Sequence, residues 1–204
     1  MLLRHLAIML RLGLLTACVV ISNPSDSLAK GTLWENWGAV LRGEVPCEPA
    51  VGIYAGQSYD WSEMNFGLVS YQVLYDHETI WLHQAPDGLG VRLEGNIGPA
   101  GGTEFSGARL MASANVLAVY ELTSREKQTI VPYIEGGIGV IYTDFQRSGQ
   151  GSRVNFNPVA GVGLRRGPMF LSLRLFHVSN AGLNDDNRGF NGLVLGAGVY
   201  LGGR

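Results

Sequence analysis

A histidine and a serine stand two positions apart near the carboxyl end of the chain, at His177 and Ser179. A series of leucines precedes them at every second position: Leu171, Leu173 and Leu175. Because successive side chains of a β-strand point to opposite faces, all five share one face of a strand predicted at 169–179. The Cβ atoms of the histidine and the serine are then about 6.5–7 Å apart, so a tilted imidazole reaches the hydroxyl. An imidazole that takes the proton of a serine prepares its oxygen to attack an ester carbonyl.

The same pair also fits a simpler interpretation, because polar residues at the end of an apolar strand are common where a membrane meets water. The other titratable residues do not form a second site. His77 and His83 lack the spacing of metal ligands, and Asp185 with Asp186 offers too few oxygens for calcium. We therefore expect no metal and no organic cofactor.

Apolar and polar side chains alternate along most of the chain. Around 154–165, for example, one face carries Val154, Phe156, Ala160, Val162 and Leu164, and the other carries Asn155, Asn157 and Arg165. The alternation predicts eight strands, at 50–58, 64–75, 88–97, 109–122, 129–143, 153–165, 169–179 and 190–202. An even number of such strands favours an all-β fold, an eight-stranded antiparallel outer-membrane β-barrel with its apolar face toward lipid.

The connections fit a membrane barrel. Those at 124–127 and 165–168 are short and polar, whereas those at 98–107 and 144–153 are longer and rich in glycine. Tight periplasmic turns that alternate with longer outer loops give this order. With both termini in the periplasm, the strand that carries the histidine and the serine runs outward. The pair is then expected at the outer leaflet.

The chain begins with the features of an exported protein. Arg4 and a mostly apolar run at 6–21 precede Ser27-Leu28-Ala29, which is the order of a secretory signal peptide. We therefore predict that residues 1–29 are a signal peptide. The segment Leu15-Thr16-Ala17-Cys18 also fits a lipoprotein signal, in which Cys18 would be acylated.

The rest of the chain divides into two parts. Residues 30–49 show no clear alternation and are expected to form a periplasmic lead-in, and residues 50–204 form the transmembrane barrel. The segment 76–88 fits either additional strand or a short helix. Once the leader is removed, Cys47 has no partner for an intrachain disulfide.

Composition narrows the class of protein. Charged residues make up 16% of the chain, below the ~25% of soluble domains, and glycine is frequent at 29 residues. A net charge of −2 without a basic stripe argues against a nucleic-acid partner. A soluble lipid-carrying barrel is the alternative, but it would place its apolar faces inside and its polar faces outside. The sequence leaves open whether the barrel is a monomer or a homodimer.

A longer motif surrounds the histidine and the serine. His177-Val178-Ser179-Asn180-Ala181-Gly182 is followed by Asn187-Arg188-Gly189-Phe190-Asn191. This motif resembles that of the PagL-like lipid A 3-O-deacylases, also called the acyloxyacyl hydrolase family, which runs His-x-Ser-Asn-Ala-Gly and then Asn-x-Gly. The resemblance implies an outer-membrane esterase that removes an ester-linked 3-hydroxyacyl chain from the lipid A of lipopolysaccharide.

The resemblance also implies roles for single residues. Ser179 is the expected nucleophile and His177 its general base. The loop after the serine is expected to supply oxyanion donors, from Asn180 and the backbone N–H of Gly182. Two further residues of the motif are expected to shape that loop: Asn187 and Gly189.

Asn191 departs from the family, whose best-known members carry Glu at the matching position. An amide oxygen can accept a hydrogen bond from the imidazole and hold one tautomer, but it lacks the charge of a carboxylate. A carboxylate-to-amide change in a serine-protease triad costs ~10⁴ in kcat, attributed to the wrong tautomer of the histidine. Asp185 or Asp186 is an alternative group to orient the histidine. The departure also leaves a non-catalytic structural or lipid-binding barrel as the alternative function.

Overall fold

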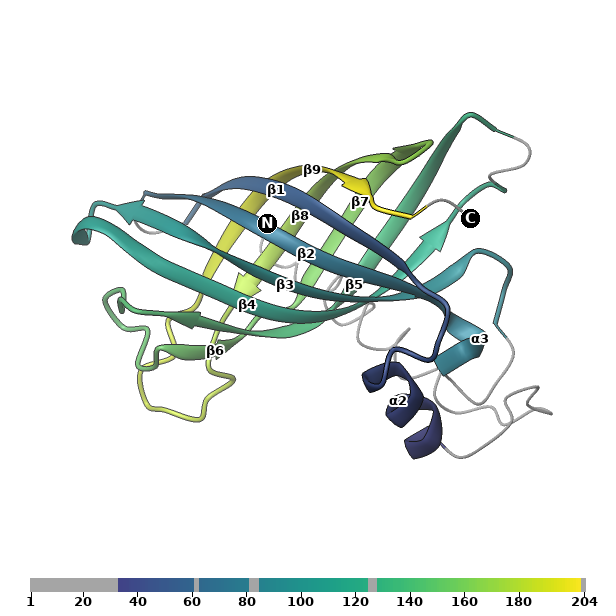
Figure 1. Cartoon of the computed structure of the whole chain (residues 1–204). Helices are drawn as coiled ribbons and strands as arrows, with labels where there is room; N and C mark the ends of the chain where they lie inside the picture. Colours follow the sequence, from purple (N-terminus) through teal and green to yellow (C-terminus); the bar gives the residue numbers. More distant parts are fainter. Residues whose placement is uncertain (1–32, 61–62, 81–84, 125–127, 203–204) are drawn as a thin grey trace.

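The computed structural model describes residues 33–60, 63–80, 85–124 and 128–202. The predicted signal peptide with Cys18, together with His83 and most of the predicted turn at 124–127, lies outside them. Strands dominate the described chain (Figure 1). They are β1 (Glu48–Ser58), β2 (Met64–Asp76), β3 (Leu89–Gly102), β4 (Phe105–Glu121), β5 (Ile130–Thr143), β6 (Val154–Phe156), β7 (Val159–Arg166), β8 (Met169–Val178) and β9 (Phe190–Tyr200). Two short helices lie outside the sheet: α2 (Leu33–Leu41) and α3 (His77–Ile80).

The strands form one antiparallel sheet that closes on itself. Neighbours pair in the order β4-β3-β2-β1-β9-β8-β7-β5, and the pairing of β4 with β5 completes the ring. β6 also pairs with β5, so β6 and β7 are two stretches of one barrel strand. The first and last strands pair from Ala50↔Tyr200 to Ser58↔Gly192. The prediction of an eight-stranded antiparallel barrel is confirmed.

The strand predicted at 153–165 is interrupted at Asn157 and Pro158. Proline has no N–H to donate to a ladder, so regular pairing stops there. Asn157 still exchanges two backbone hydrogen bonds with Gly139, of 2.8 and 3.0 Å, and the Pro158 carbonyl accepts the N–H of His177 at 3.0 Å. The wall therefore stays closed, and the interruption lies beside the histidine.

The prediction of a long loop at 98–107 is wrong. β3 and β4 continue through most of this segment, and only Thr103 and Glu104 remain as a turn. Gly98 allows close approach between strands, because a Cβ there would lie 2.0 Å from the carbonyl oxygen of Gly67. Gly101 and Gly107 have open space beside them, and Gly107 has a φ of 72°. At Gly98, therefore, glycine marks a tightly packed wall instead of a loop.

The other connections agree more closely with the sequence. α3 lies within the segment 76–88, at His77–Ile80, where the helical alternative holds. Gly167 and Pro168 alone link β7 to β8, and Gly167 has a φ of 55°, in the left-handed region that glycine adopts without strain. α2 lies within the lead-in predicted at 30–49, and β1 starts slightly earlier than expected, at Glu48.

The barrel has two unlike ends (Figure 1). The helical end carries α2, α3 and the last residues of β9. The opposite, loop end carries Tyr59 and Asp60 after β1, and the connections at 103–104, 144–153 and 179–189. At the helical end, Val40 of α2 and Ile80 of α3 pack in one apolar cluster with Tyr75 and Val91 of the barrel wall. Within the described residues, neither helix has the length and apolarity to cross a membrane.

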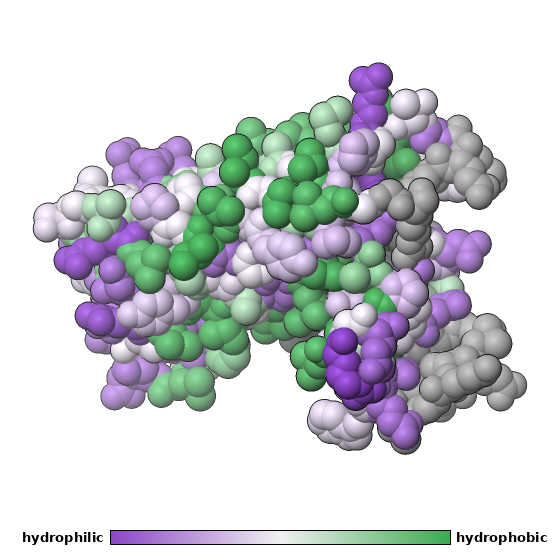
Figure 2. All heavy atoms as spheres, in the orientation of Figure 1, coloured by the Kyte–Doolittle hydropathy of each residue, from purple (hydrophilic) through white to green (hydrophobic). Residues whose placement is uncertain are grey.

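The faces of the wall follow the predicted alternation. On β8, Leu171, Leu173 and Leu175 are exposed, whereas Ser172 and Arg174 are buried in the lumen. Apolar side chains cover much of the visible wall, and polar residues gather at its two ends (Figure 2). This is the arrangement of a membrane barrel, because a soluble lipid carrier would reverse the two faces.

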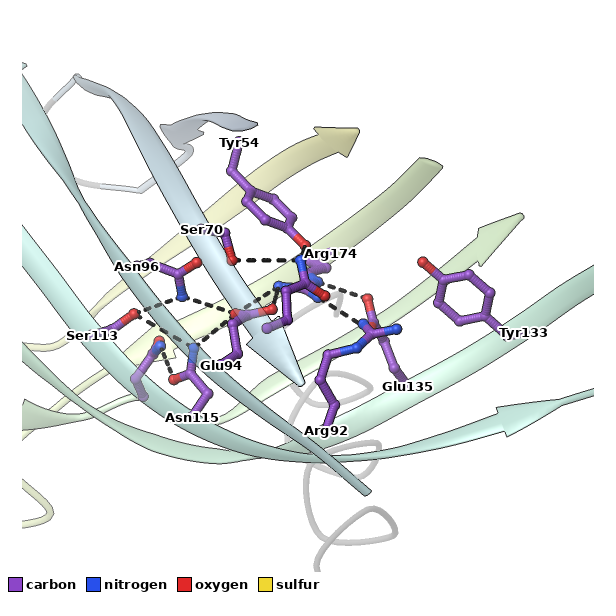
Figure 3. Close-up of polar contacts among 12 residues, drawn as sticks. Tyr54, Ser70, Arg92, Glu94, Asn96, Ser113, Asn115, Tyr133, Glu135 and Arg174 are labelled. Atoms are coloured by element: carbon purple, nitrogen blue, oxygen red, sulfur yellow. Dashed lines mark hydrogen bonds and ion pairs between the residues drawn. The ribbon is translucent and has the colours of Figure 1, made fainter. Parts of the chain in front are cut away.

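Buried ion pairs fill the lumen (Figure 3). Arg174 donates from Nε to Glu135 at 2.6 Å and from Nη1 to Glu94 at 2.9 Å. Arg92 pairs with the same Glu135. These four side chains are at most 6% exposed, and Asn115 adds a donor to Glu94 at 3.0 Å. Each charge therefore has a partner of opposite sign, which buried ions require.

Replacement of Arg174 by Met should destabilise the barrel strongly. The substitution leaves Glu94 and Glu135 buried with one partner fewer, and breaking such a pair costs about 3–5 kcal/mol of unfolding free energy. Urea unfolding in detergent micelles measures the loss. The control is Arg166→Met at an exposed strand end, which should stay within about 0.5 kcal/mol of wild type. Equal urea midpoints of unfolding for the two variants would contradict a stabilising role for the ion pairs in the lumen.

Candidate active site

His177 and Ser179 lie at the loop end of the barrel, on the outward face, as the alternation predicts. Both side chains are half-buried, whereas Val178 and Asn180, which point the other way, are buried. The pair continues the outward series of leucines on β8. The face on which chemistry could occur is therefore the face of the wall and not the lumen.

Neighbouring strands hold the pair from both sides. On one side, His177 lies opposite Asn191 of β9 in the ladder. On the other side, Phe156 and Ser179 exchange backbone hydrogen bonds of 2.8 and 3.2 Å. Together with the bond from His177 to the Pro158 carbonyl, these contacts tie the backbone of both residues to the neighbouring strands, although Ser179 lies one residue past the end of β8. Sites built on strands in this way hold their geometry more closely than sites built on loops.

The structure brings the third residue of the predicted triad to the histidine. Nδ1 of His177 lies 2.8 Å from Oδ1 of Asn191. An amide oxygen only accepts, so the hydrogen of the imidazole belongs on Nδ1 and Nε2 is left unprotonated. Asp185 and Asp186, the alternative orienting groups, are exposed and make no hydrogen bond to His177 among the described residues.

The structure adds Asp60, which the sequence analysis did not select. Asn191 donates from Nδ2 to Oδ2 of Asp60 at 2.6 Å, and the backbone N–H of Asn191 lies 2.9 Å from each oxygen of the same carboxylate. Asp60 follows β1 closely, and Tyr59 beside it donates its N–H to the Asn191 carbonyl at 3.2 Å. Barrel closure could have indicated this contact from the sequence. In a closed barrel the first and last strands pair, so the end of the first strand lies beside the start of the last strand.

The loop after Ser179 is fastened by side-chain amides. Asn187 Oδ1 accepts the backbone N–H of Asn180 at 2.8 Å, and Asn180 Oδ1 accepts the N–H of Gly182 at 2.9 Å. Asn180 Nδ2 also donates to the Asp186 carbonyl at 2.7 Å. The two donors predicted for an oxyanion are thus engaged inside the loop in this structure. Their assignment to that role stays a prediction.

Gly189 lies against the histidine ring. A Cβ at this position would lie 2.9 Å from Cε1 of His177 and 2.3 Å from the carbonyl oxygen of Val178. Any side chain here would displace the ring or the start of the hairpin. The requirement for glycine at Gly189 comes from this close approach, since its φ is not in the left-handed region.

Arg147 supports the site from the neighbouring loop. Its Nη2 donates to the Asp60 carbonyl at 3.1 Å, and its guanidinium carbon lies 4.9 Å from the centre of the Phe190 ring. Burial lowers the pKa of the Arg147 guanidinium, and the carboxylates of Glu104 and Asp60 partly offset that effect. The loop end is thus one connected structure that includes β1, the 144–153 connection and β9.

The lumen leaves little free space, whereas the outer wall beside the site exposes apolar side chains. A lumen pocket bordered by Tyr54, Glu94 and Arg174 has a volume of about 40 Å³, enough for a water or two but not for an acyl chain. Outside, Leu175 and Leu193 expose apolar side chains on the wall below the site, and Phe156 exposes its ring beside Ser179. Among the residues that the structure describes, no group of three His, Cys, Asp or Glu side chains is placed to hold a metal.

Comparison with known proteins identifies relatives of the whole barrel. A family model described as "Lipid A 3-O-deacylase (PagL)" matches residues 65–200, more than half of the chain. The crystal structure of the outer membrane enzyme PagL superposes with a TM-score of 0.54 at 22% identity, covering 74% of this chain and 98% of that chain. The crystal structure of Neisserial surface protein A superposes with a TM-score of 0.51 at 11% identity, covering 75% of this chain and 96% of that chain. No curated protein matches the chain.

The two superpositions show that this chain shares its fold with those proteins, and the match to the family model shows that it belongs to the family. The match also includes the complete hairpin with His177, Ser179 and Asn191. The chain is therefore an outer-membrane β-barrel that belongs to the lipid A 3-O-deacylase (PagL) family.

Proposed function

We propose that this protein is an outer-membrane esterase that removes an ester-linked 3-hydroxyacyl chain from lipid A. The observation that carries the proposal is the 2.8 Å contact between Nδ1 of His177 and Oδ1 of Asn191, on the same outward face as Ser179. It leaves Nε2 of the imidazole free to accept a proton. The family to which the chain belongs names the substrate class.

The reaction would proceed in two steps. The Ser179 oxygen attacks the ester carbonyl while its proton passes to Nε2 of His177. The alkoxide of lipid A leaves, takes that proton and becomes a free hydroxyl, and the acyl chain stays on the serine. A water molecule, deprotonated by the same imidazole, then attacks the acyl carbonyl, and the bond between that carbon and the Ser179 oxygen breaks. The imidazolium returns its proton to the serine oxygen, and the 3-hydroxy fatty acid is released. Neither step as written calls on a metal or an organic cofactor.

An oxyanion forms in each step and needs a donor. The N–H of Ala181 lies between the engaged N–H groups of Asn180 and Gly182 and makes no hydrogen bond within the described part of the chain. Ala181 has a φ of 55°, a left-handed conformation that is uncommon for a residue with a Cβ. Such strain often occurs where a loop is shaped for function. The turn that contains these three residues is our candidate for the oxyanion site.

The outward placement supports lipid as the substrate. Lipid A in the outer leaflet would meet the pair laterally, without entering the lumen. Leu175, Leu193 and Phe156 would contact its acyl chains, and the ester group would lie at the level of the loop end. This orientation requires that the loop end faces the cell exterior, as expected when both termini are periplasmic.

Expression in a Gram-negative host should shorten lipid A by one hydroxyacyl chain, because the enzyme and its substrate then share one membrane. Mass spectrometry of extracted lipid A measures the loss. Ser179→Ala, which lacks the nucleophile, is the matched control and should leave lipid A intact. Unchanged lipid A with folded protein in the membrane, or equal loss with the alanine variant, would refute the proposal.

The alternative function is a non-catalytic structural or lipid-binding barrel. Asn191 in place of Glu favours it on sequence grounds, whereas the contact of Asn191 with both His177 and Asp60 supports a working site. A serine-reactive phosphonate separates the two, because only an activated hydroxyl reacts with it. We expect labelling of Ser179 that is lost in His177→Ala; a folded wild-type protein that is never labelled would favour the alternative.

Gly189→Ala should lower kcat by about 100-fold, because a displacement of the imidazole near 1 Å is enough for such a loss. The barrel should still fold, as measured by its heat-modifiable migration on gels. The control is Gly95→Ala, whose Cβ would have no neighbour within 4 Å. Full activity of the Gly189 variant would show that the close approach to the ring has no role in positioning it.

A further inference from the structure

Asp60 contacts the residue that hydrogen-bonds to the histidine ring. Its carboxylate accepts the Nδ2 hydrogen of Asn191 at 2.6 Å, and Oδ1 of the same amide lies 2.8 Å from Nδ1 of His177. The three side chains form a continuous series of hydrogen bonds from a loop carboxylate to the imidazole. All three are half-buried, so the series is only partly screened by solvent.

The carboxylate determines which way the amide of Asn191 faces. An ionised carboxylate only accepts hydrogen bonds, so the NH₂ group of Asn191 must face Asp60 and its oxygen must face His177. With the oxygen beside it, Nδ1 of the imidazole carries the hydrogen, and Nε2 is the base. Without Asp60, the amide could rotate and present its NH₂ group to Nδ1, which would favour the opposite tautomer. A histidine in that tautomer cannot accept the serine proton.

The carboxylate also supplies the charge that Asn191 lacks. When the imidazole takes the proton of Ser179 it becomes a cation, and a negative charge two hydrogen bonds away stabilises it. The family's best-known members place that charge directly on the residue at position 191. In this chain the amide of Asn191 and the carboxylate of Asp60 divide the task between them.

The position of Asp60 is itself well determined. Arg147 donates to its backbone carbonyl at 3.1 Å, and the neighbouring Tyr59 N–H pairs with the Asn191 carbonyl at 3.2 Å. The Asn191 N–H, 2.9 Å from both carboxylate oxygens, adds a backbone donor. This last contact also allows a purely structural role, in which Asp60 only caps the first residues of β9.

We infer that Asp60 is a positioning residue for the catalytic histidine: acting through Asn191, it holds the imidazole in the tautomer with hydrogen on Nδ1 and supplies the negative charge opposite the imidazolium. The inference rests on the proposed esterase function. It names a residue outside the His-x-Ser motif and outside the matched segment 65–200.

The test uses Asp60→Asn and the exchange variant Asp60→Asn/Asn191→Asp in the full-length protein. In Asp60→Asn an amide oxygen can still cap the Asn191 N–H, but the charge is gone and the amide of Asn191 is free to rotate. We expect kcat on lipid A to fall by about 10- to 1,000-fold with KM nearly unchanged. The loss should be smaller than the ~10⁴ seen when the carboxylate that touches the histidine of a serine-protease triad is changed to an amide, because Asp60 acts one residue further away.

The exchange variant keeps the same atoms and the same net charge but places the carboxylate directly on the imidazole. The new amide at position 60 then donates to the new carboxylate at position 191, which accepts from Nδ1 of His177, so every hydrogen bond of the series has a counterpart. We expect kcat to return to within about threefold of wild type. A capping role predicts no such rescue, because an amide at position 60 caps β9 in both variants. Asp185→Asn, an exposed carboxylate on the 179–189 loop, is the matched control and should behave as wild type.

If the wild-type enzyme deacylates lipid A and the Ser179→Ala variant does not, either of two results would overturn the inference. The first is full kcat in Asp60→Asn. The second is loss of kcat in Asp60→Asn without recovery in the exchange variant, with both proteins folded in the membrane. If the folded wild-type protein leaves lipid A unchanged, the proposed function itself is refuted. This outcome differs from failure of the Asp60 inference, because it is seen in the wild type and does not depend on residue 60.

Discussion

The antiparallel pairing of β1 with β9 is the interaction on which the rest of the structure depends. It closes the barrel and leaves no unpaired strand edge in the described wall, and a wall in hydrocarbon cannot tolerate such an edge. It also brings the residues after β1 next to the first residues of β9, although 131 positions separate Asp60 from Asn191. The closure that makes the fold stable in a membrane therefore also completes the side-chain series behind His177.

The two faces of β8 explain how one strand serves both stability and chemistry. Arg174 points inward to Glu94 and Glu135, where the ion pairs fill the lumen and hold the strands together. His177 and Ser179 point outward, at the end of a series of leucines. Since inward and outward residues belong to one backbone, the packed lumen limits movement of the outward pair. A packed lumen is thus a condition for a well-defined site on the wall, and the pocket it leaves is too small to compete for an acyl chain.

Sequence patterns predicted the local features well and the non-local ones poorly. Alternation was sufficient to predict the barrel, the outward face of His177 and Ser179, and the ladder position of Asn191, because each depends on residues close in sequence or on one strand pair. The prediction of a loop at 98–107 was wrong because glycine permits both a turn and a close strand contact. At Gly98 the neighbouring Gly67 carbonyl, which is distant in sequence, decides between the two. Asp60 was missed because its partner is supplied by barrel closure and no local motif marks it.

The pairing of Asn191 with Asp60 has a physical basis in the place where the site lies. In the proposed mechanism the histidine faces lipid, and a negative charge must lie close enough to it to stabilise the imidazolium. Asn191 places a neutral amide on the outward face, where an apolar surrounding penalises charge. Asp60 keeps the carboxylate at the loop end, where a backbone N–H of β9 binds it and Arg147 fixes its backbone. Under the proposed mechanism, the roles of orientation and charge, which a single glutamate would combine, belong to two residues that meet only when the barrel closes: Asn191 at the start of β9 and Asp60 just after β1.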